Sequence, residues 1–149
     1  MNIRLTKEFT FEMAHALAGY DGACRHIHGH SFQLKVTVVG KPKNDLQSPK
    51  DGMLIDFGDL KRLVKENIID QFDHALVINK RSKNDFAKMS NTEVLGKIVY
   101  VSFQPTSENL LGYFVSILQP LIPEGVFLHS LLLRETGTSY AEWYADDNR

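Results

Sequence analysis

Two stretches of alternating sequence, residues 3–15 and 28–38, constrain this 149-residue chain more than any other feature. In each, apolar side chains fall at nearly every second position, with mostly polar or charged side chains between them. A period of two is typical of a strand that buries one face. We therefore predict two half-buried strands, joined by residues 16–27, and expect them to pair as an antiparallel ladder.

Three histidines lie on the apolar faces of these predicted strands. His15 continues the apolar parity of the first strand, and His28 and His30 begin that of the second. Antiparallel pairing brings the end of the first strand beside the start of the second, so the three rings converge. Three imidazoles on an apolar face are costly to satisfy without a metal, so the pattern favours a metal site.

Two alternatives to this ligand set remain open from the pattern. The histidines could be a core pair satisfied by backbone carbonyls plus one loop residue. His26 also shares the parity of His28 and His30. Three ligands spaced two apart on one strand span about 13 Å, too far for one ion with bonds of about 2 Å unless the backbone kinks. His15 is therefore the better third ligand.

Reactive side chains accompany the histidines. Cys24, the only cysteine, lies within the seven residues that end at His30, and a thiol beside a metal is typical of a reactive group. Asp73 and His74 are adjacent at the end of a predicted helix. Neighbouring side chains on a regular element diverge, so this pair by itself is more simply explained as an incidental loop dipeptide.

The composition limits partners and location. Lys and Arg number 17 against 18 Asp and Glu, and no basic run is interleaved with aromatic residues, so we expect a small-molecule partner and no nucleic acid. A single cysteine excludes an internal disulfide. Without an apolar export signal or a bilayer-length apolar run, we expect a cytoplasmic protein with no membrane partner.

The remaining elements complete an α+β order within one domain, 1–149. A helix capped by Asp56 runs to about residue 70, and a second helix opens at 105–109, where Thr106 or Ser107 is the expected cap. Residues 79–92 form a loop with a short helix, 97–103 can add a strand, and 140–144 form the last strand. Strand 126–135 is apolar on both faces, which predicts cover by the helices and by another subunit. Its last residue, Glu135, shares the parity of Leu131 and Leu133, and if buried could accept two parallel N–H bonds from a planar ligand.

With these motifs the chain resembles the 6-pyruvoyl-tetrahydropterin synthase family, including the bacterial 6-carboxy-tetrahydropterin synthases of the queuosine route. The matching motifs are F-x-x-A-H at 11–15, C-x-x-x-H-G-H at 24–30, G-M-x-I-D-F at 52–57, D-H at 73–74, P-T-S-E-N at 105–109 and R-E-T at 134–136. The resemblance implies the tunnelling fold, a four-stranded antiparallel sheet with two helices between strands two and three, assembled into multi-subunit barrels. A homohexamer with shared active sites is the family expectation.

The resemblance also implies roles for individual residues. Zn²⁺ would be held by His15, His28 and His30. Cys24 would be the catalytic base, with Asp73 and His74 as its relay, often from a neighbouring subunit. The substrate residues would be Glu135, which anchors the pterin, and Thr106 and Ser107, which line the same pocket.

The implied activity is that of a zinc-dependent lyase, 6-carboxytetrahydropterin synthase. It converts 7,8-dihydroneopterin triphosphate to 6-carboxy-5,6,7,8-tetrahydropterin with release of acetaldehyde and triphosphate, in queuosine biosynthesis. Three residues separate Cys24 from the H-G-H motif, as in the bacterial enzymes. The alternatives are a 6-pyruvoyl-tetrahydropterin synthase, which eliminates triphosphate from the same substrate, and a non-catalytic zinc- or pterin-binding module. A cupin is disfavoured because no glutamate follows the H-x-H pair.

Two features depart from the family pattern. The asparagine after the D-H motif comes one place late, at Asn79, and an insert occupies about 80–104. We expect the insert to alter subunit packing or the rim of the pocket.

Overall fold

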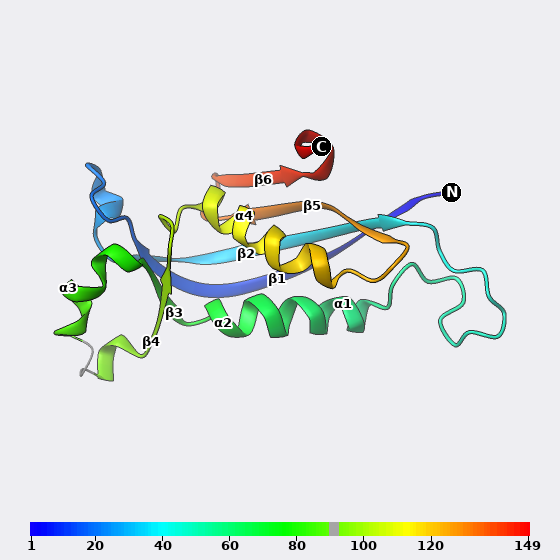
Figure 1. Ribbon diagram of the computed structural model, residues 1–149, viewed down its shortest axis with the longest axis horizontal. Helices are drawn as coiled ribbons and strands as arrows, with labels where there is room; N and C mark the ends of the chain where they lie inside the picture. Colours follow the sequence, from blue (N-terminus) through cyan, green and yellow to red (C-terminus); the bar gives the residue numbers. More distant parts are fainter. Residues whose placement is uncertain (90–92) are drawn as a thin grey trace.

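The computed structural model describes residues 1–89 and 93–149 and has a six-stranded sheet at its centre (Figure 1). The strands lie in the order β4-β3-β1-β2-β5-β6. Their bounds are β1 Ile3–Ala16, β2 His28–Gly40, β3 Ala75–Asn79, β4 Lys97–Val101, β5 Val126–Arg134 and β6 Tyr140–Tyr144. The helices are α1 Phe57–Val64, α2 Asp70–Phe72, α3 Lys83–Ala87 and α4 Ser107–Leu118, and short 3-10 turns include Ala23–Arg25 and Glu93–Leu95.

The long β1–β2 ladder confirms the predicted antiparallel pairing. Its register runs from Ile3 opposite Gly40 to His15 opposite His28 without a break. Phe11 and Phe32 lie opposite each other, and their rings stack with centroids 5.4 Å apart. Both rings are buried, so the ladder supplies the centre of the core as well as its register.

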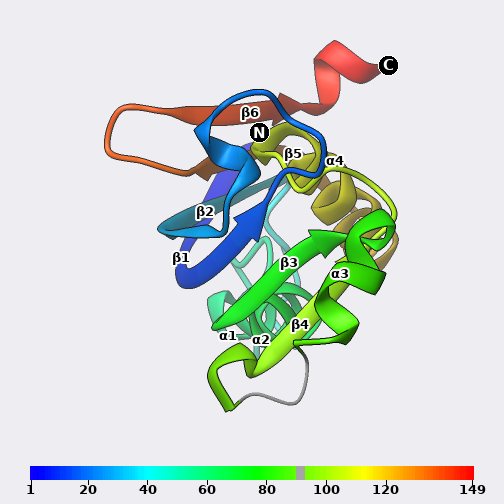
Figure 2. The ribbon, with the colours of Figure 1, turned by 90° about the vertical axis from the view of Figure 1, so that its left-hand side faces the viewer.

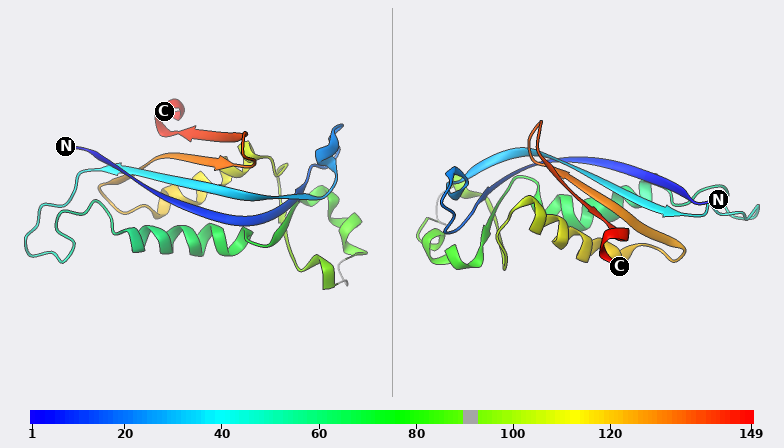
Figure 3. Two further views of the ribbon diagram at one scale, coloured as in Figure 1. Left: turned by 180° about the vertical axis from the view of Figure 1, so that it is seen from behind. Right: turned by 90° about the horizontal axis from the view of Figure 1, so that it is seen from above.

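Two helical segments cover one face of this ladder, and β1 and β2 arch over them (Figure 3). The first begins at the predicted Asp56 cap and runs through α1, a π-helical stretch over Lys65–Ile69, and α2. The second, α4, is capped by Thr106, whose Oγ1 accepts a hydrogen bond from the backbone of Asn109. The buried residues that these helices contribute are Leu60, Val64, Ile68, Phe72, Leu110, Leu111, Phe114, Val115 and Leu118. None of the described helices is long and apolar enough to cross a membrane.

The four predicted antiparallel strands are present, but the sheet has two strands more than the expected four. β3 pairs parallel with the last residues of β1, and β4 pairs parallel with β3 (Figure 2). The strand expected near residues 97–103 is confirmed as β4, whereas β3 was not predicted. All five residues of β3 are buried, so it lacks the alternation that marks a strand with one exposed face.

Strand β5 corrects a second expectation, the constant parity of residues 126–135. Thr37 pairs with Ser130 but the next residue, Val38, pairs with Leu128, so His129 is an extra residue in a β-bulge. The bulge places Val126 and Leu128 on the same buried face as Leu131 and Leu133. Phe127 is instead 66% exposed, so in this chain the strand is not covered on both sides along its whole length.

The described part of segment 80–104 builds a second, small core on the sheet face opposite α1 and α4. Leu76 and Ile78 of β3 contact Ala14 and Ala16 of β1 there. The residues that pack on this cluster from the segment are Phe86, Leu95, Ile98 and Tyr100. The expected short helix within 79–92 is α3, and residues 90–92 lie outside the described residues.

Candidate metal centre and active site

The three predicted histidines converge on the helix-covered face of the sheet. His15 and His28 are opposite each other in the ladder, and His30 follows two residues later on the same face of β2. One ring nitrogen from each lies within 4.8 Å of the others, a group that could hold a metal ion. This convergence of the three rings is the one that strand parity predicted. His26, the alternative third ligand, lies on the exposed loop before β2.

Backbone carbonyls fix the ring nitrogens of two of these histidines. His15 Nδ1 lies 2.7 Å from the Pro105 oxygen, and His28 Nδ1 lies 2.8 Å from the His26 oxygen. A carbonyl only accepts, so each Nδ1 carries the hydrogen and each Nε2 presents a lone pair. The two Nε2 atoms are 3.1 Å apart and, as neutral rings, have no proton to share. Two ligands of one tetrahedral zinc lie about 3.3 Å apart, so this pair fits a cation.

Burial favours the neutral form that a metal requires. His15 is 2% exposed, and this desolvation lowers the pKa of its imidazole, although the hydrogen bond to the Pro105 carbonyl opposes the shift. A neutral imidazole is the ligating species. The environment of His15 therefore prepares its Nε2 for metal binding at neutral pH.

His30 adds a buried ring nitrogen that lacks a well-aligned hydrogen bond. Its Nε2 makes no hydrogen bond among the described residues, although Glu135 Oε1 lies 3.2 Å away. An orphaned buried nitrogen is unfavourable by about 1–3 kcal/mol in a folded protein. Together with the facing lone pairs of His15 and His28, it indicates that these residues fit a bound metal ion.

A pocket of about 200 Å³ opens beside His15 and contains most of the predicted substrate residues. Its lining includes Cys24, Thr106, Ser107 and Glu135. Ser107 Oγ donates a hydrogen bond to Glu135 Oε2 at 2.5 Å. The Glu135 side chain is 25% exposed. Residues from β1, the loop before β2, α4 and the end of β5 thus meet in one place.

Cys24 reaches this pocket from the short 3-10 turn Ala23–Arg25. Its carbonyl accepts a hydrogen bond from the Leu17 backbone at 3.0 Å, which closes the loop after β1. The thiol is partly buried. Its place in the same pocket as His15 agrees with the predicted association of the thiol with the histidines.

Glu108 and Tyr140 also line this pocket, and sequence reasoning gave neither a role there. Glu108 follows Ser107 in the P-T-S-E-N motif, so the predicted substrate role of Ser107 was the signal that could have identified it. Tyr140 is the first residue of β6, and only the pairing of β5 with β6 brings it to this side.

Asp73 and His74 form a contact that their adjacency did not require. His74 has a positive φ of 56°, unusual for a residue with a side chain, and its Nδ1 lies 3.0 Å from Asp73 Oδ1. The same carboxylate accepts from the Glu12 backbone N–H at 2.9 Å. These two contacts, that of Glu12 first, lower the pKa of Asp73.

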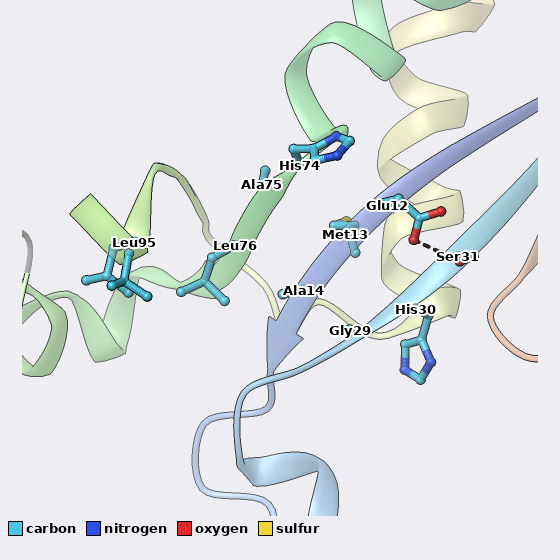
Figure 4. Close-up of a pocket in the computed structure, with 11 residues that line it drawn as sticks. Glu12, Met13, Ala14, Gly29, His30, Ser31, His74, Ala75, Leu76 and Leu95 are labelled. Carbon is cyan, nitrogen blue, oxygen red and sulfur yellow. Dashed lines mark hydrogen bonds between the residues drawn. The ribbon is translucent and has the colours of Figure 1, made fainter. Parts of the chain in front are cut away.

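The structure does not bring this pair to Cys24 within one chain. His74 lines a separate pocket of about 420 Å³ with Glu12, Leu76 and Leu95 (Figure 4). In that view the ring of His74 lies beside the start of β3, whereas the ring of His30 points away on the other side of β2. The predicted relay and the predicted base therefore belong to different surfaces of the chain.

Comparisons with known proteins identify the family of this chain. A family profile described as 6-pyruvoyl tetrahydropterin synthase matches residues 4–146. The chain is 34% identical over 143 residues to a 6-carboxy-5,6,7,8-tetrahydropterin synthase of Haemophilus influenzae, covering 94% of this chain and 97% of that protein. It is 31% identical over 142 residues to the protein of the same name from Rickettsia typhi, covering 94% and 99%.

Solved structures show the same fold. An uncharacterized protein of Wolinella succinogenes superposes with a TM-score of 0.75 at 23% identity, covering 97% of this chain and 99% of the other. The 6-pyruvoyl tetrahydropterin synthase of Caenorhabditis elegans superposes with a TM-score of 0.68 at 21% identity, covering 97% and 96%. The fold is thus the tunnelling fold of these structures, and the chain belongs to the 6-pyruvoyl tetrahydropterin synthase family.

Proposed function

We propose that this protein is a zinc-dependent lyase that converts 7,8-dihydroneopterin triphosphate to 6-carboxy-5,6,7,8-tetrahydropterin, with release of acetaldehyde and triphosphate. The observation that carries the proposal is the pocket in which Cys24 and Glu135 lie beside the histidine cluster. The names of the Haemophilus and Rickettsia relatives support the carboxy product. The pathway would be queuosine biosynthesis, in the cytoplasm.

In this proposal His15, His28 and His30 hold zinc through three neutral nitrogens. The bound ion would act as a Lewis acid toward the side-chain hydroxyls of the substrate. Cys24 takes a proton from the substrate side chain, a role open to a cysteine that lines the substrate pocket. Its position in the pocket beside His15 supports this assignment.

Glu135 anchors the pterin ring. A carboxylate can accept two parallel N–H bonds, and the 2-amino group and adjacent ring N–H of a pterin present such a pair. The Ser107 hydroxyl holds Oε2 at 2.5 Å and so orients the carboxylate, while Thr106 caps α4 beside it. Both residues line the pocket with Glu135.

Asp73 and His74 complete the acid–base chemistry from a neighbouring subunit in a homohexamer. Asp73 Oδ1 accepts from His74 Nδ1, which leaves Nε2 free to exchange a proton with the substrate or with Cys24. The exposure of His74, whose side chain is 77% accessible, supports a partner outside its own chain. We also propose that residues 1–149 form one domain with an insert at about 80–104.

A 6-pyruvoyl-tetrahydropterin synthase is the second candidate, favoured by the description of the matching family and by the Caenorhabditis structure. The test is incubation of the zinc-loaded protein with dihydroneopterin triphosphate, with products identified by mass. Acetaldehyde with a 6-carboxy pterin is the expected result. A pyruvoyl product without acetaldehyde would select the second candidate.

The rival from another class is a zinc- or pterin-binding module without turnover. The Cys24→Ala variant separates it from an enzyme, because a binding module has no need of the thiol. We expect this variant to retain zinc and pterin binding and to lose turnover. Absence of any product from the zinc-loaded wild-type protein would leave the binding module as the better account.

A further inference from the structure

We propose that Gln104 is a positioning residue for the reaction, because its side chain holds the loop that carries Cys24 at a fixed place beside His15. We call residues 17–27 the Cys24 loop. The inference rests on the proposed function, in which the Cys24 thiol takes a proton from a substrate anchored by Glu135. Gln104 does not line the substrate pocket, so it would act only through the loop that it holds.

The side-chain amide of Gln104 makes two hydrogen bonds to the backbone of Ala18. Its Oε1 accepts from the Ala18 N–H at 3.1 Å, and its Nε2 donates to the Ala18 carbonyl at 2.5 Å. The amide oxygen can only accept and the amide nitrogen can only donate, so the two bonds fix the orientation of the side chain as well as its position. Both bonds are partly buried, where hydrogen bonds are stronger than in water.

The Cys24 loop has few other attachments to the fold. Its first residue, Leu17, donates from its backbone N–H to the Cys24 carbonyl at 3.0 Å, so a shift at the start of the loop is passed directly to the cysteine. Outside the strand ladders, two attachments tie the loop to the rest of the described residues by hydrogen bonds. Gln104 holds its start, and His28 Nδ1 holds the His26 carbonyl at its end. Loss of the Gln104 bonds would therefore free the half of the loop that leads to the thiol.

The backbone of Gln104 is itself fixed by the first turn of α4. The Gln104 carbonyl accepts from the Thr106 N–H at 2.8 Å and from Asn109 Nδ2 at 3.0 Å. Helix α4 is anchored in the core by Leu110 and Phe114, which are both fully buried. The side chain of Gln104 thus extends from a rigid part of the fold, and it can set the position of the more weakly attached loop.

The next residue, Pro105, holds the metal ligand. Its carbonyl lies 2.7 Å from His15 Nδ1 and accepts the hydrogen of that ring nitrogen. The connection between β4 and α4 passes the end of β1, where the Cys24 loop begins (Figure 1). Two consecutive residues therefore hold the thiol loop and the imidazole. Their geometry sets the separation of the two groups, and displacement of a reacting group by about 1 Å can lower a rate by about 10²-fold.

Two substitutions at position 104 test this role. Gln104→Leu keeps the approximate size of the side chain and removes both hydrogen bonds to Ala18. Gln104→Glu keeps the acceptor for the Ala18 N–H but places an oxygen against the Ala18 carbonyl, so it tests the same contact if the leucine variant does not fold. Gln47→Leu is the matched control, because Gln47 is exposed in the loop between β2 and α1 and its side chain makes no hydrogen bond among the described residues.

The first readout separates positioning from a general loss of structure. In both Gln104 variants we expect kcat for acetaldehyde release to fall about 10–100-fold. Zinc content per chain and KM should stay within about twofold of wild type, because the three histidines, Pro105 and Glu135 are unchanged. A purely structural role would instead lower zinc content and pterin binding together with turnover. Proportional loss of all three would overturn the proposal, and so would a kcat equal to that of Gln47→Leu.

The second readout needs no turnover, because Cys24 is the only cysteine of the chain. The thiol is partly buried, so release of its loop should raise the rate of alkylation by iodoacetamide at least about fivefold in the zinc-loaded Gln104 variants. Gln47→Leu should react as wild type does. Equal alkylation rates in all four proteins would overturn the proposal. Failure of the proposed function is distinguishable, because wild-type protein would then form no pterin product while the alkylation rates still report whether Gln104 holds Cys24.

Discussion

The Glu135→Gln substitution is the most direct test of the proposed pterin-binding role of Glu135. Glutamine keeps the size of the side chain and one oxygen but replaces the other oxygen with an NH₂ group. Ser107 Oγ already donates to Oε2, and Oε1 lies near His30. Whichever atom becomes nitrogen, one ligand N–H would face a donor instead of an acceptor.

The magnitude follows from that mismatch. A hydrogen bond to a charged group contributes about 1.5–3 kcal/mol, and a buried donor without a partner costs about 1–3 kcal/mol more. The sum is about 2.5–6 kcal/mol, and each 1.4 kcal/mol corresponds to a factor of ten. We therefore expect kcat/KM to fall by about 10²–10⁴ and the affinity for an unreactive pterin to fall in parallel.

The assay combines pterin fluorescence titration, acetaldehyde release and zinc content per chain. Glu8→Gln is the matched control, because Glu8 pairs with Lys35 on the other face of β1 and should leave all three quantities unchanged. Pterin binding within twofold of wild type would refute the role of Glu135. Loss of zinc in proportion to loss of binding would also refute it, because Glu135 would then support His30 and not the ligand.

Three further predictions concern the metal, the shared site and the buried imidazole of His15. His28→Ala should lower zinc content from about one per chain to near zero by atomic emission, with turnover lost in proportion. Co-expressed Cys24→Ala and His74→Ala chains, each inactive alone, should regain up to about a quarter of wild-type turnover, since random mixing leaves that share of shared sites intact. Metal-free protein should lose thermal stability as pH falls below about 6.5, the ordinary histidine pKa. Burial lowers the pKa of His15, so near this pH the unfolded chain takes up a proton that the folded chain does not. A melting temperature that stays constant from pH 7.5 to 5.5 would contradict this sign.

The sequence predicted the metal half of the site because that half depends on local periodicity. A strand alternates with period two, so the positions of His15, His28 and His30 follow once the two strands pair without slipping. The ladder has no bulge between them. The parity of Glu135 was correct for a similar reason, since it lies on the same side of the bulge as Leu131 and Leu133.

The failures came from features that local periodicity does not encode. Strand β3 reads as a short apolar run, which is equally compatible with a buried helical turn. The bulge at His129 inserts one residue and reverses the parity of everything before it, and only the pairing with β2 reveals it. The Asp73–His74 contact requires a left-handed backbone at a histidine, a conformation that no spacing rule predicts.

The two halves of the proposed chemistry therefore differ in how they depend on the fold. The histidines, Cys24 and Glu135 are brought together within one chain by the β1–β2 ladder, the loop between its strands and the β5 end. Asp73 and His74 lie at the β1 edge of that ladder, against the backbone of Glu12. A chain that folds but does not assemble would then bind zinc and pterin yet leave the thiol without its relay. Zinc and pterin binding should consequently be independent of protein concentration, whereas the turnover rate per chain should fall on dilution. A site contained in a single chain would show no such difference between binding and turnover.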